Sequence, residues 1–214
     1  TSMDQYDRTR RDGLIAINLK DGDELISVRR VAKGEKVIMV SSAGKAIKWD
    51  EGEVRGMGRD TMGVRGMNVP PIARVLGMEI AKPRTELFVI TEKGFGKRSQ
   101  FDEYRETNRG AKGVKTIHVT DKTGELVAIV DVKGDEDLMI ITRNGLTIRM
   151  GIDTLRVMGR ATQGVKLINL REGDEIAAVA KVISEDEQQE DSTEGSPAET
   201  AGDAASLQAS SEGH

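Results

Sequence analysis

Arginine and lysine side chains recur beside glycines in three connecting segments of this 214-residue sequence. The segments are Met57–Gly63, with the pattern Met-Gly-Arg-x-Thr-x-Gly, Thr107–Gly113, and Met158–Gly164, which repeats the pattern of the first. Guanidinium and ammonium groups form charge-assisted hydrogen bonds with phosphate, and glycine lets backbone N–H groups approach the same anion. The pattern indicates phosphate binding, although glycine turns with solvated arginines would explain any single segment.

The candidate phosphate-binding residues lie in these segments, in a truncated first copy at Arg8–Gly13, or in the predicted strands. They are Arg10, Arg11, Arg59, Arg65, Lys97, Arg98, Arg109, Gly110, Lys112, Gly113, Lys115, Arg149, Arg160 and Lys166. Only 3% of the residues are aromatic, whereas proteins that read single strands stack bases on aromatic rings. Contacts to duplex phosphates need no such rings, so the expected ligand is double-stranded DNA.

A repeat of about fifty residues positions these segments. One phrase, a glycine followed by a short apolar run, occurs at Gly13–Leu19, Gly63–Val69, Gly113–Val119 and Gly164–Leu170. A second phrase, an apolar run, a glycine turn and a basic run, occurs between the copies at Val37–Trp49, Leu87–Ser99 and Leu138–Met150. The cations should therefore recur at regular intervals along one rim.

Each repeat is expected to form four short strands in two hairpins. In the best example the strands are expected at Val114–Val119, Glu125–Val132, Leu138–Thr142 and Leu146–Met150. The Asn144-Gly145 pair is a strong hairpin signal because both residues tolerate positive φ. The apolar runs alternate only partly, which is typical of strands covered on both faces.

The predicted fold is all-β: a propeller-like β-pinwheel of four-stranded antiparallel blades, with about three and a half repeats of ~50 residues over 1–183. Counting from Leu14 gives three full units and then one hairpin, Val165–Val182. Because a closed propeller needs at least about four blades, we expect an open arc or a fragment of a longer ring.

The charge is unevenly distributed. The net charge is −4, but residues 184–214 contain nine acidic residues and no lysine or arginine, which leaves a net +5 on residues 1–183. The acidic segment is predicted to be a disordered tail. It would act either as a solubilising extension or as a competitor for the basic surface.

Enzyme chemistry, metals and membranes are not indicated by the sequence. There are two histidines, no cysteine, no nucleotide-binding motif and no carboxylate set with metal-ligand spacing. We therefore expect no catalytic residue, no cofactor and no metal. Without a leader or an apolar stretch of about twenty residues, the protein is expected to be soluble and cytoplasmic, with no membrane partner.

The sequence resembles the C-terminal domain of the DNA gyrase A subunit from about Tyr6 to Val182. The residues that carry the resemblance are the phrases Met57–Gly66 and Met158–Lys166, the turns at Gly22–Ile26 and Gly173–Ile176, and the acidic tail. The resemblance implies a β-pinwheel of about six blades that wraps duplex DNA around a basic perimeter and so supports negative supercoiling. It also implies bacterial, nucleoid-associated partners, namely the gyrase B subunit together with the N-terminal breakage-reunion part of gyrase A. The parent would be an ATP-dependent type IIA topoisomerase, and this piece would be non-catalytic.

The sequence departs from that family in one motif. The gyrase A box, which reads Gln-Arg-Arg-Gly-Gly-Lys-Gly or close to it, has no intact copy, and Thr107–Gly113 is the nearest segment. Two alternatives stay open: the related C-terminal domain of topoisomerase IV, on the subunit that corresponds to gyrase A, and a protein-binding β-propeller scaffold. A propeller of the WD type would repeat a Trp-Asp pair in each blade, and Trp49-Asp50 occurs once.

Overall fold

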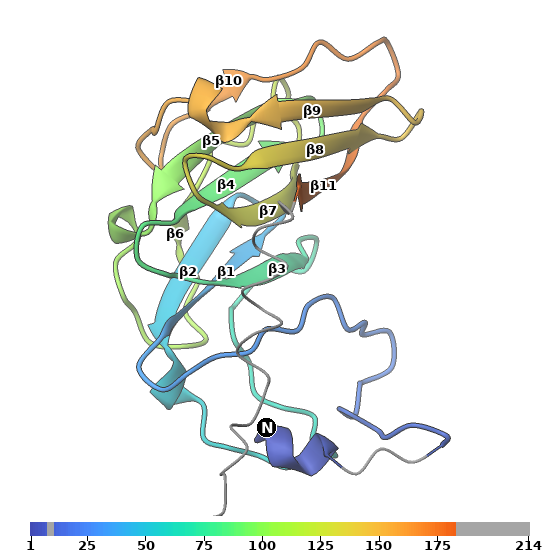
Figure 1. The fold of residues 1–214 in the computed structure, drawn as a ribbon, viewed down its shortest axis with the longest axis vertical. Coiled ribbons are helices and arrows are strands. Elements are labelled where there is room, and N and C mark those ends of the chain that lie inside the picture. Colours follow the sequence, from blue (N-terminus) through green and yellow to red (C-terminus); the bar gives the residue numbers. More distant parts are fainter. Residues whose placement is uncertain (8–10, 183–214) are drawn as a thin grey trace, which may run out of the picture. The chain divides into compact units, whose positions relative to one another are not determined.

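Short antiparallel strand pairs build three sheets in the computed structural model, which describes residues 1–7 and 11–182 (Figure 1). The strands are β1 Lys36–Ser41, β2 Lys45–Asp50, β3 Val75–Ile80, β4 Glu86–Thr91, β5 Phe95–Gln100, β6 Val114–Lys115, β7 Leu126–Val132, β8 Asp137–Thr142, β9 Thr147–Gly151, β10 Val165–Lys166 and β11 Ile176–Val182. Short 3₁₀ turns lie at Met3–Tyr6, Glu51–Glu53, Phe101–Glu103 and Ile152–Thr154. Arg10 and the acidic segment 184–214 lie outside the described residues.

Each sheet is centred on one hairpin and is completed by strands from later repeats. The strand orders are β3-β1-β2-β6, β10-β5-β4-β7 and β11-β8-β9. In the first sheet, β3 comes from the next repeat and β6 from the repeat after that. The all-β fold with four-stranded antiparallel sheets is confirmed, and the expected positions of β6 to β9 agree with the structure to within a few residues.

The expected grouping of strands is wrong. Val114–Val119 and Glu125–Val132 were expected to form a hairpin, but β6 pairs with β2 and β7 pairs with β4. Val165–Val182 forms no hairpin either, because β10 pairs with β5 and β11 with β8. The physical reason is that a hairpin has two bare edges, and the flanking strands of later repeats cover them.

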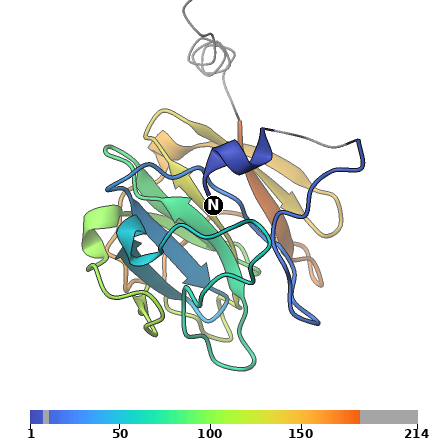
Figure 2. The same ribbon diagram turned by 90° about the horizontal axis from the view of Figure 1, so that it is seen from below.

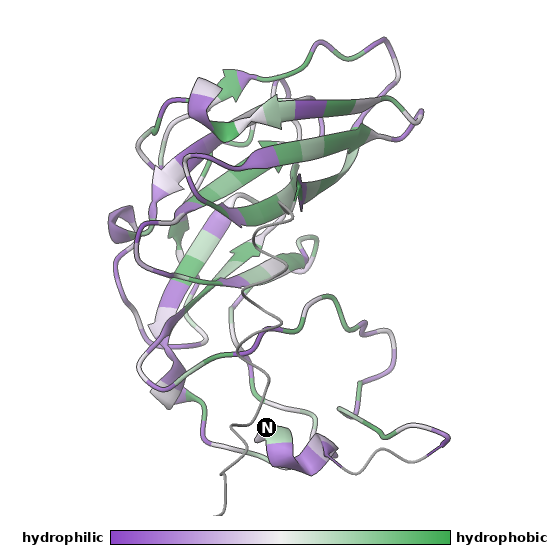
Figure 3. Cartoon of the chain, viewed as in Figure 1, coloured by the Kyte–Doolittle hydropathy of each residue, from purple (hydrophilic) through white to green (hydrophobic). Residues whose placement is uncertain are grey.

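The core lies between the stacked sheets, and the side chains of β4 contribute to two of its clusters. Leu87 and Val89 on one face join a cluster with Ile38 and Val40 of β1. Phe88 and Ile90, on the other face, join a cluster with β8. All four β4 side chains are 0% exposed, so period-two alternation here distributes apolar side chains between two interfaces. In Figure 3 β8 is mostly hydrophobic, β2 and β5 mix hydrophobic with hydrophilic residues, and the connecting segments carry both kinds.

Residues 12–34 contain no strand, although the repeat predicts two (Figure 2). Their apolar side chains are exposed, with Ile15 at 63% and Val28 at 71%. In later repeats the matching segments pair with hairpins one and two repeats upstream. Residues 12–34 belong to none of the three sheets. Within the described part of the chain no helix is long and apolar enough to cross a membrane.

Two glycines provide a test of the strand exchange. Gly113 has φ +73, and an added Cβ would lie 2.4 Å from the Ala46 carbonyl oxygen of β2, whereas at Gly63 (φ +69) it would meet nothing within 4 Å. Gly63→Ala should cost only the left-handed backbone strain, about 1–2 kcal/mol. Gly113→Ala should cost about 1–3 kcal/mol more, because it also forces β6 away from β2. Urea unfolding measures both, and equal losses would contradict this close approach.

Candidate nucleic-acid interface

The arginines of the three connecting segments make the same hydrogen bond. The Nη1 atom of Arg59 donates to the Ile15 carbonyl at 2.7 Å, Nη1 of Arg160 donates to the Lys115 carbonyl at 3.0 Å, and Nη1 of Arg109 donates to the Arg65 carbonyl. Each arginine therefore ties its own segment to the strand or extended segment that follows the preceding connecting segment.

The backbone N–H of each arginine donates to a side chain of an upstream 3₁₀ turn. The acceptor is Oε1 of Gln5 for Arg59, at 3.2 Å. It is Oε2 of Glu53 for Arg109, at 2.6 Å, and Oε2 of Glu103 for Arg160, at 3.3 Å. We call the arginine with its two bonds the arginine clamp; the three clamps are centred on Arg59, Arg109 and Arg160.

A third bond repeats at each clamp. The backbone N–H groups of Asn18, Asn68 and His118 donate to the carbonyls of Thr61, Ala111 and Thr162 at 3.0–3.3 Å. His118 thus has the same backbone role as the asparagines at its place in the repeat. The three clamps therefore have one geometry, so the cations that they carry recur in register, as the sequence predicted.

Exposed cations surround the second clamp. Arg65, Lys112 and Lys115 are exposed, and none of them forms an ion pair within residues 1–7 and 11–182. Lys166 is likewise exposed beside the third clamp, and Arg11 is exposed near the start. Gly110, with φ +80, donates its N–H to the Gly66 carbonyl at 2.8 Å, so its own backbone donor is satisfied within the protein.

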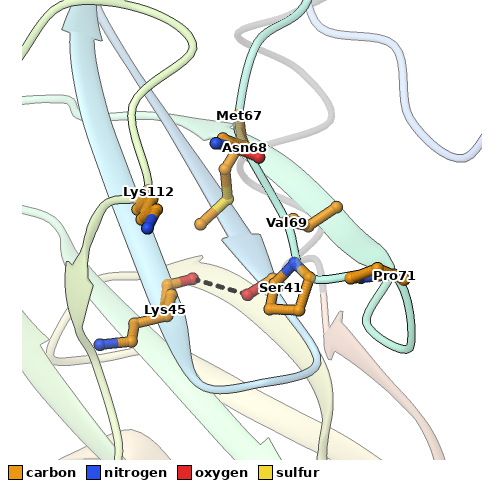
Figure 4. A pocket seen from close by; sticks show the side chains of 8 residues that line it. Ser41, Lys45, Met67, Asn68, Val69, Pro71 and Lys112 are labelled. Atoms are coloured by element: carbon orange, nitrogen blue, oxygen red, sulfur yellow. Dashed lines mark hydrogen bonds between the residues drawn. The ribbon is translucent and has the colours of Figure 1, made fainter.

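A cavity of about 400 Å³ opens beside these lysines (Figure 4). Lys45 of β2 and Lys112 line one side of it, and Asn68, Pro70 and Pro71 line the rest together with Ser41, Met67 and Val69. No carboxylate is among the lining residues. Lys45 also lies directly opposite Lys115 in the β2–β6 ladder, and like charges so placed repel each other. An anion in this cavity would relieve the repulsion.

A second cavity of about 500 Å³ is rich in cations. Lys93, Lys122, Lys166 and Arg171 line it, together with Phe95, Leu170 and Asp174. The Lys122 ammonium lies 5.6 Å from the centre of the Phe95 ring, within cation–π range. Four cations that line the two cavities were not among the predicted residues: Lys45, Lys93, Lys122 and Arg171. The signal for Lys45 was present, since it starts the basic run after Gly44.

Lys97 corrects the predicted interface. Its side chain is buried, with 0% of the residue exposed. The Nζ atom donates to the carbonyls of Gly159 and Arg160 at 2.7 and 2.5 Å, and to the Thr162 hydroxyl at 3.2 Å. The expected direct contact with phosphate is therefore wrong for Lys97. Its ammonium instead holds the segment Gly159–Thr162 of the third clamp through these three hydrogen bonds.

Arg98 and Arg149 are held in ion pairs. Nη1 of Arg98 lies 2.9 Å from Glu86, with both side chains at most 14% exposed, and Nε of Arg98 donates to the Leu155 carbonyl. For Arg98 a direct phosphate contact is again not supported. Arg149 pairs with Asp137 at 2.6 Å, but its side chain is 61% exposed, so it could still meet an anion.

The burial of Lys97 predicts a pH dependence of stability. Desolvation lowers the pKa of Lys97 from about 10.5 to about 8; the nearby Glu103 opposes this shift and Arg160 adds to it. Since the folded chain binds this proton more weakly than the unfolded chain, the free energy of unfolding should rise between about pH 8 and 10.5, by up to about 1.4 kcal/mol per pH unit. Urea titrations should show this rise in the native chain and not in Lys97→Ile/Thr162→Ala, which copies the apolar Ile47 and Ala111 of the preceding repeat. A variant with the same pH slope as the native chain would contradict it.

Metal binding has no support among the described residues, where no group of three or more His, Cys, Asp or Glu side chains could hold an ion. The arrangement supplies exposed positive charge at Arg65, Lys112, Lys115 and Lys166, which suits non-covalent binding of anions.

Comparisons with known proteins agree with this geometry. A family model described as "DNA gyrase C-terminal domain, beta-propeller" matches residues 1–32, 35–82, 85–133 and 136–183. The chain is 39% identical over 189 residues to the DNA gyrase A subunit of Staphylococcus epidermidis (strain ATCC 12228), which covers 87% of this chain and 21% of that protein. It is 38% identical over 194 residues to the DNA gyrase A subunit of Staphylococcus aureus (strain MRSA252), covering 89% and 22%. The chain thus spans about a fifth of the length of these relatives.

Two solved structures share the fold. The DNA gyrase A C-terminal domain superposes with a TM-score of 0.73 at 28% identity, covering 81% of this chain and 59% of the other. The C-terminal domain of DNA topoisomerase IV superposes with a TM-score of 0.80 at 21% identity, covering 89% and 60%, and at that identity it supports the fold alone. The match of the family model over four consecutive segments, together with the recurring clamps, shows that this chain belongs to the family of DNA gyrase C-terminal domains.

Proposed function

We propose that this chain binds duplex DNA through the phosphates and bends it along the rim that carries the arginine clamps. The observation that carries the proposal is the identical hydrogen bonding of the three clamps, because it repeats exposed cations such as Arg65, Lys115 and Lys166 at fixed places. A polyanion that follows the rim meets these cations in succession. Phosphate contacts of this kind give affinity with little sequence preference.

The lysine-lined cavity is the best candidate for one phosphate group. Lys45 and Lys112 line it without a lining carboxylate, and Lys115 lies opposite Lys45 in the β2–β6 ladder. Bending 20–30 base pairs by 40–90° costs on the order of 1–6 kcal/mol, which several neutralised phosphates can offset. The acidic segment 184–214 remains a candidate competitor for the same cations.

In a longer protein of the same family, the bound DNA would be positioned for the other parts of the assembly. We propose as partners the N-terminal breakage-reunion part of gyrase A and the gyrase B subunit, in the bacterial cytoplasm at the nucleoid. In that assembly the bent DNA would support negative supercoiling by an ATP-dependent type IIA topoisomerase. Identity to gyrase A chains near 39% favours gyrase over topoisomerase IV.

Salt dependence tests the proposal. Fluorescence anisotropy with a labelled 30-base-pair duplex should give a slope of log affinity against log salt of about −0.9 for each phosphate contacted. Lys112→Ala should make the slope shallower by about one contact and weaken binding on all sequences alike. Lys33→Ala is the matched control, because it also removes one positive charge and the Lys33 side chain is exposed, with no hydrogen bond or ion pair among the described residues. Weak binding without salt dependence would reject duplex binding in favour of a protein-binding propeller.

Nicked-circle ligation tests bending and handedness. Closing nicked circles in the presence of the chain should shift the linking number if the rim bends DNA with one hand. An unchanged linking number together with tight, salt-dependent binding would leave phosphate binding intact and exclude a handed wrap by this chain.

A further inference from the structure

The upstream side chain that closes each arginine clamp differs in charge between the clamps. Gln5 is neutral, whereas Glu53 and Glu103 carry a carboxylate. All three accept a hydrogen bond from the backbone N–H of the clamp arginine, at 2.6–3.3 Å. Because the amide of Gln5 makes this bond as a carboxylate does, the geometry does not require a negative charge.

The carboxylates occupy donors that would otherwise suit a phosphate. A backbone N–H beside glycine and arginine is an anion-binding group, and Glu53 fills that place at Arg109. Glu53 and Glu103 are exposed, so their charge faces the same solvent as Lys112 and Lys115. A phosphate approaching the second clamp would meet both the lysines and a resident anion.

We propose that Glu53 and Glu103 weaken phosphate binding at their clamps by acting as resident anions, and that these two residues set the affinity of the rim. The inference rests on the proposed DNA binding. Glu53 and Glu103 would then lower the affinity for phosphate, while the hydrogen bond that they provide to the fold could equally come from an amide, as Gln5 shows.

Lys97 makes the two carboxylates unequal. Its buried ammonium interacts favourably with Glu103, whereas Ile47, the matching residue of β2, is apolar: Lys97 lies opposite Val89 as Ile47 lies opposite Met39. The positive charge of Lys97 therefore partly offsets the negative charge of Glu103. The apolar Ile47 gives Glu53 no such compensation. Removing the Glu53 charge should have the larger effect.

The first clamp has its own acidic residue. Asp60 stands where the later segments have Gly110 and Ala161, and its carboxylate turns back over Gly58, since a Cβ added there would lie 3.0 Å from Oδ1 of Asp60. Each clamp is therefore compared with its own variant and not with the other clamps.

Charge-only substitutions test the proposal with the full chain and the labelled duplex. Glu53→Gln should tighten binding about two- to fivefold at low salt, as expected for removing one unit charge near a phosphate in water, and Glu103→Gln should tighten it less. Gln5→Glu should weaken binding by a similar factor. The differences should shrink as salt rises. A gain of affinity cannot arise from misfolding, and urea unfolding checks that each variant is folded.

Two further variants make the test specific. Glu24→Gln removes the same charge at an exposed carboxylate that makes none of the clamp hydrogen bonds, so an affinity change equal to that of Glu53→Gln would reduce the effect to net charge and overturn the proposal. In a Lys97→Ile/Thr162→Ala background, Glu103→Gln should gain as much as Glu53→Gln does in the native chain. Weaker binding by Glu53→Gln would also overturn it, because the carboxylate would then be needed to order the clamp. If the native chain shows no salt-dependent DNA binding, the proposed function itself fails, which is a separate outcome.

Discussion

Every hairpin in this chain has two bare edges, and pairing them with strands from later repeats is the constraint on which the structure depends. β1 and β2 are closed by β3 and β6, and β4 and β5 by β7 and β10. Unpaired backbone groups at a sheet edge invite other strands, so each repeat is stable only with its neighbours. The arginine clamps lie where the chain passes from one hairpin to the next, and their common geometry is a consequence of this exchange.

The hairpins could be predicted from the sequence because their signals are local. Glycine turns such as Arg143–Gly145, where Gly145 has φ +82, reverse the chain within a few residues, and the apolar runs around them are predicted as strands. Which strands share a sheet is a different matter. The composition of Val114–Lys115 does not tell whether this strand pairs with β7 or with β2. The pairing with β2 is selected because the bare edge of β2 must be covered, and about seventy residues separate β2 from β6 in the sequence. Residues 12–34 have the same local pattern, which predicts strands there as well, but in the structure they join no sheet and form no strand.

The site was predicted unevenly for a physical reason. Lys112 lies in a glycine loop, and Arg65, Lys115 and Lys166 each follow such a loop by two residues; all four are exposed, as expected close to a surface loop. A basic residue within a strand faces either solvent or core, and its type does not say which. Lys97 occupies the position of Ile47 and Ile148 in the other hairpins, so the repeat itself indicated burial. Its charge is accommodated because three oxygen acceptors of one turn surround the ammonium.

Arginine and lysine side chains have different roles at the clamps. Each clamp arginine commits one terminal nitrogen to a carbonyl of the protein, so its guanidinium is fixed and cannot follow a moving ligand. The lysines around the second clamp are point charges on flexible stems, which adapt to phosphates at variable spacing. In the proposed DNA binding that tolerance would be useful, because base composition alters groove width and phosphate position. On that proposal the fixed arginines hold the connecting segments in place, and the flexible lysines adapt to the phosphates of a bent duplex.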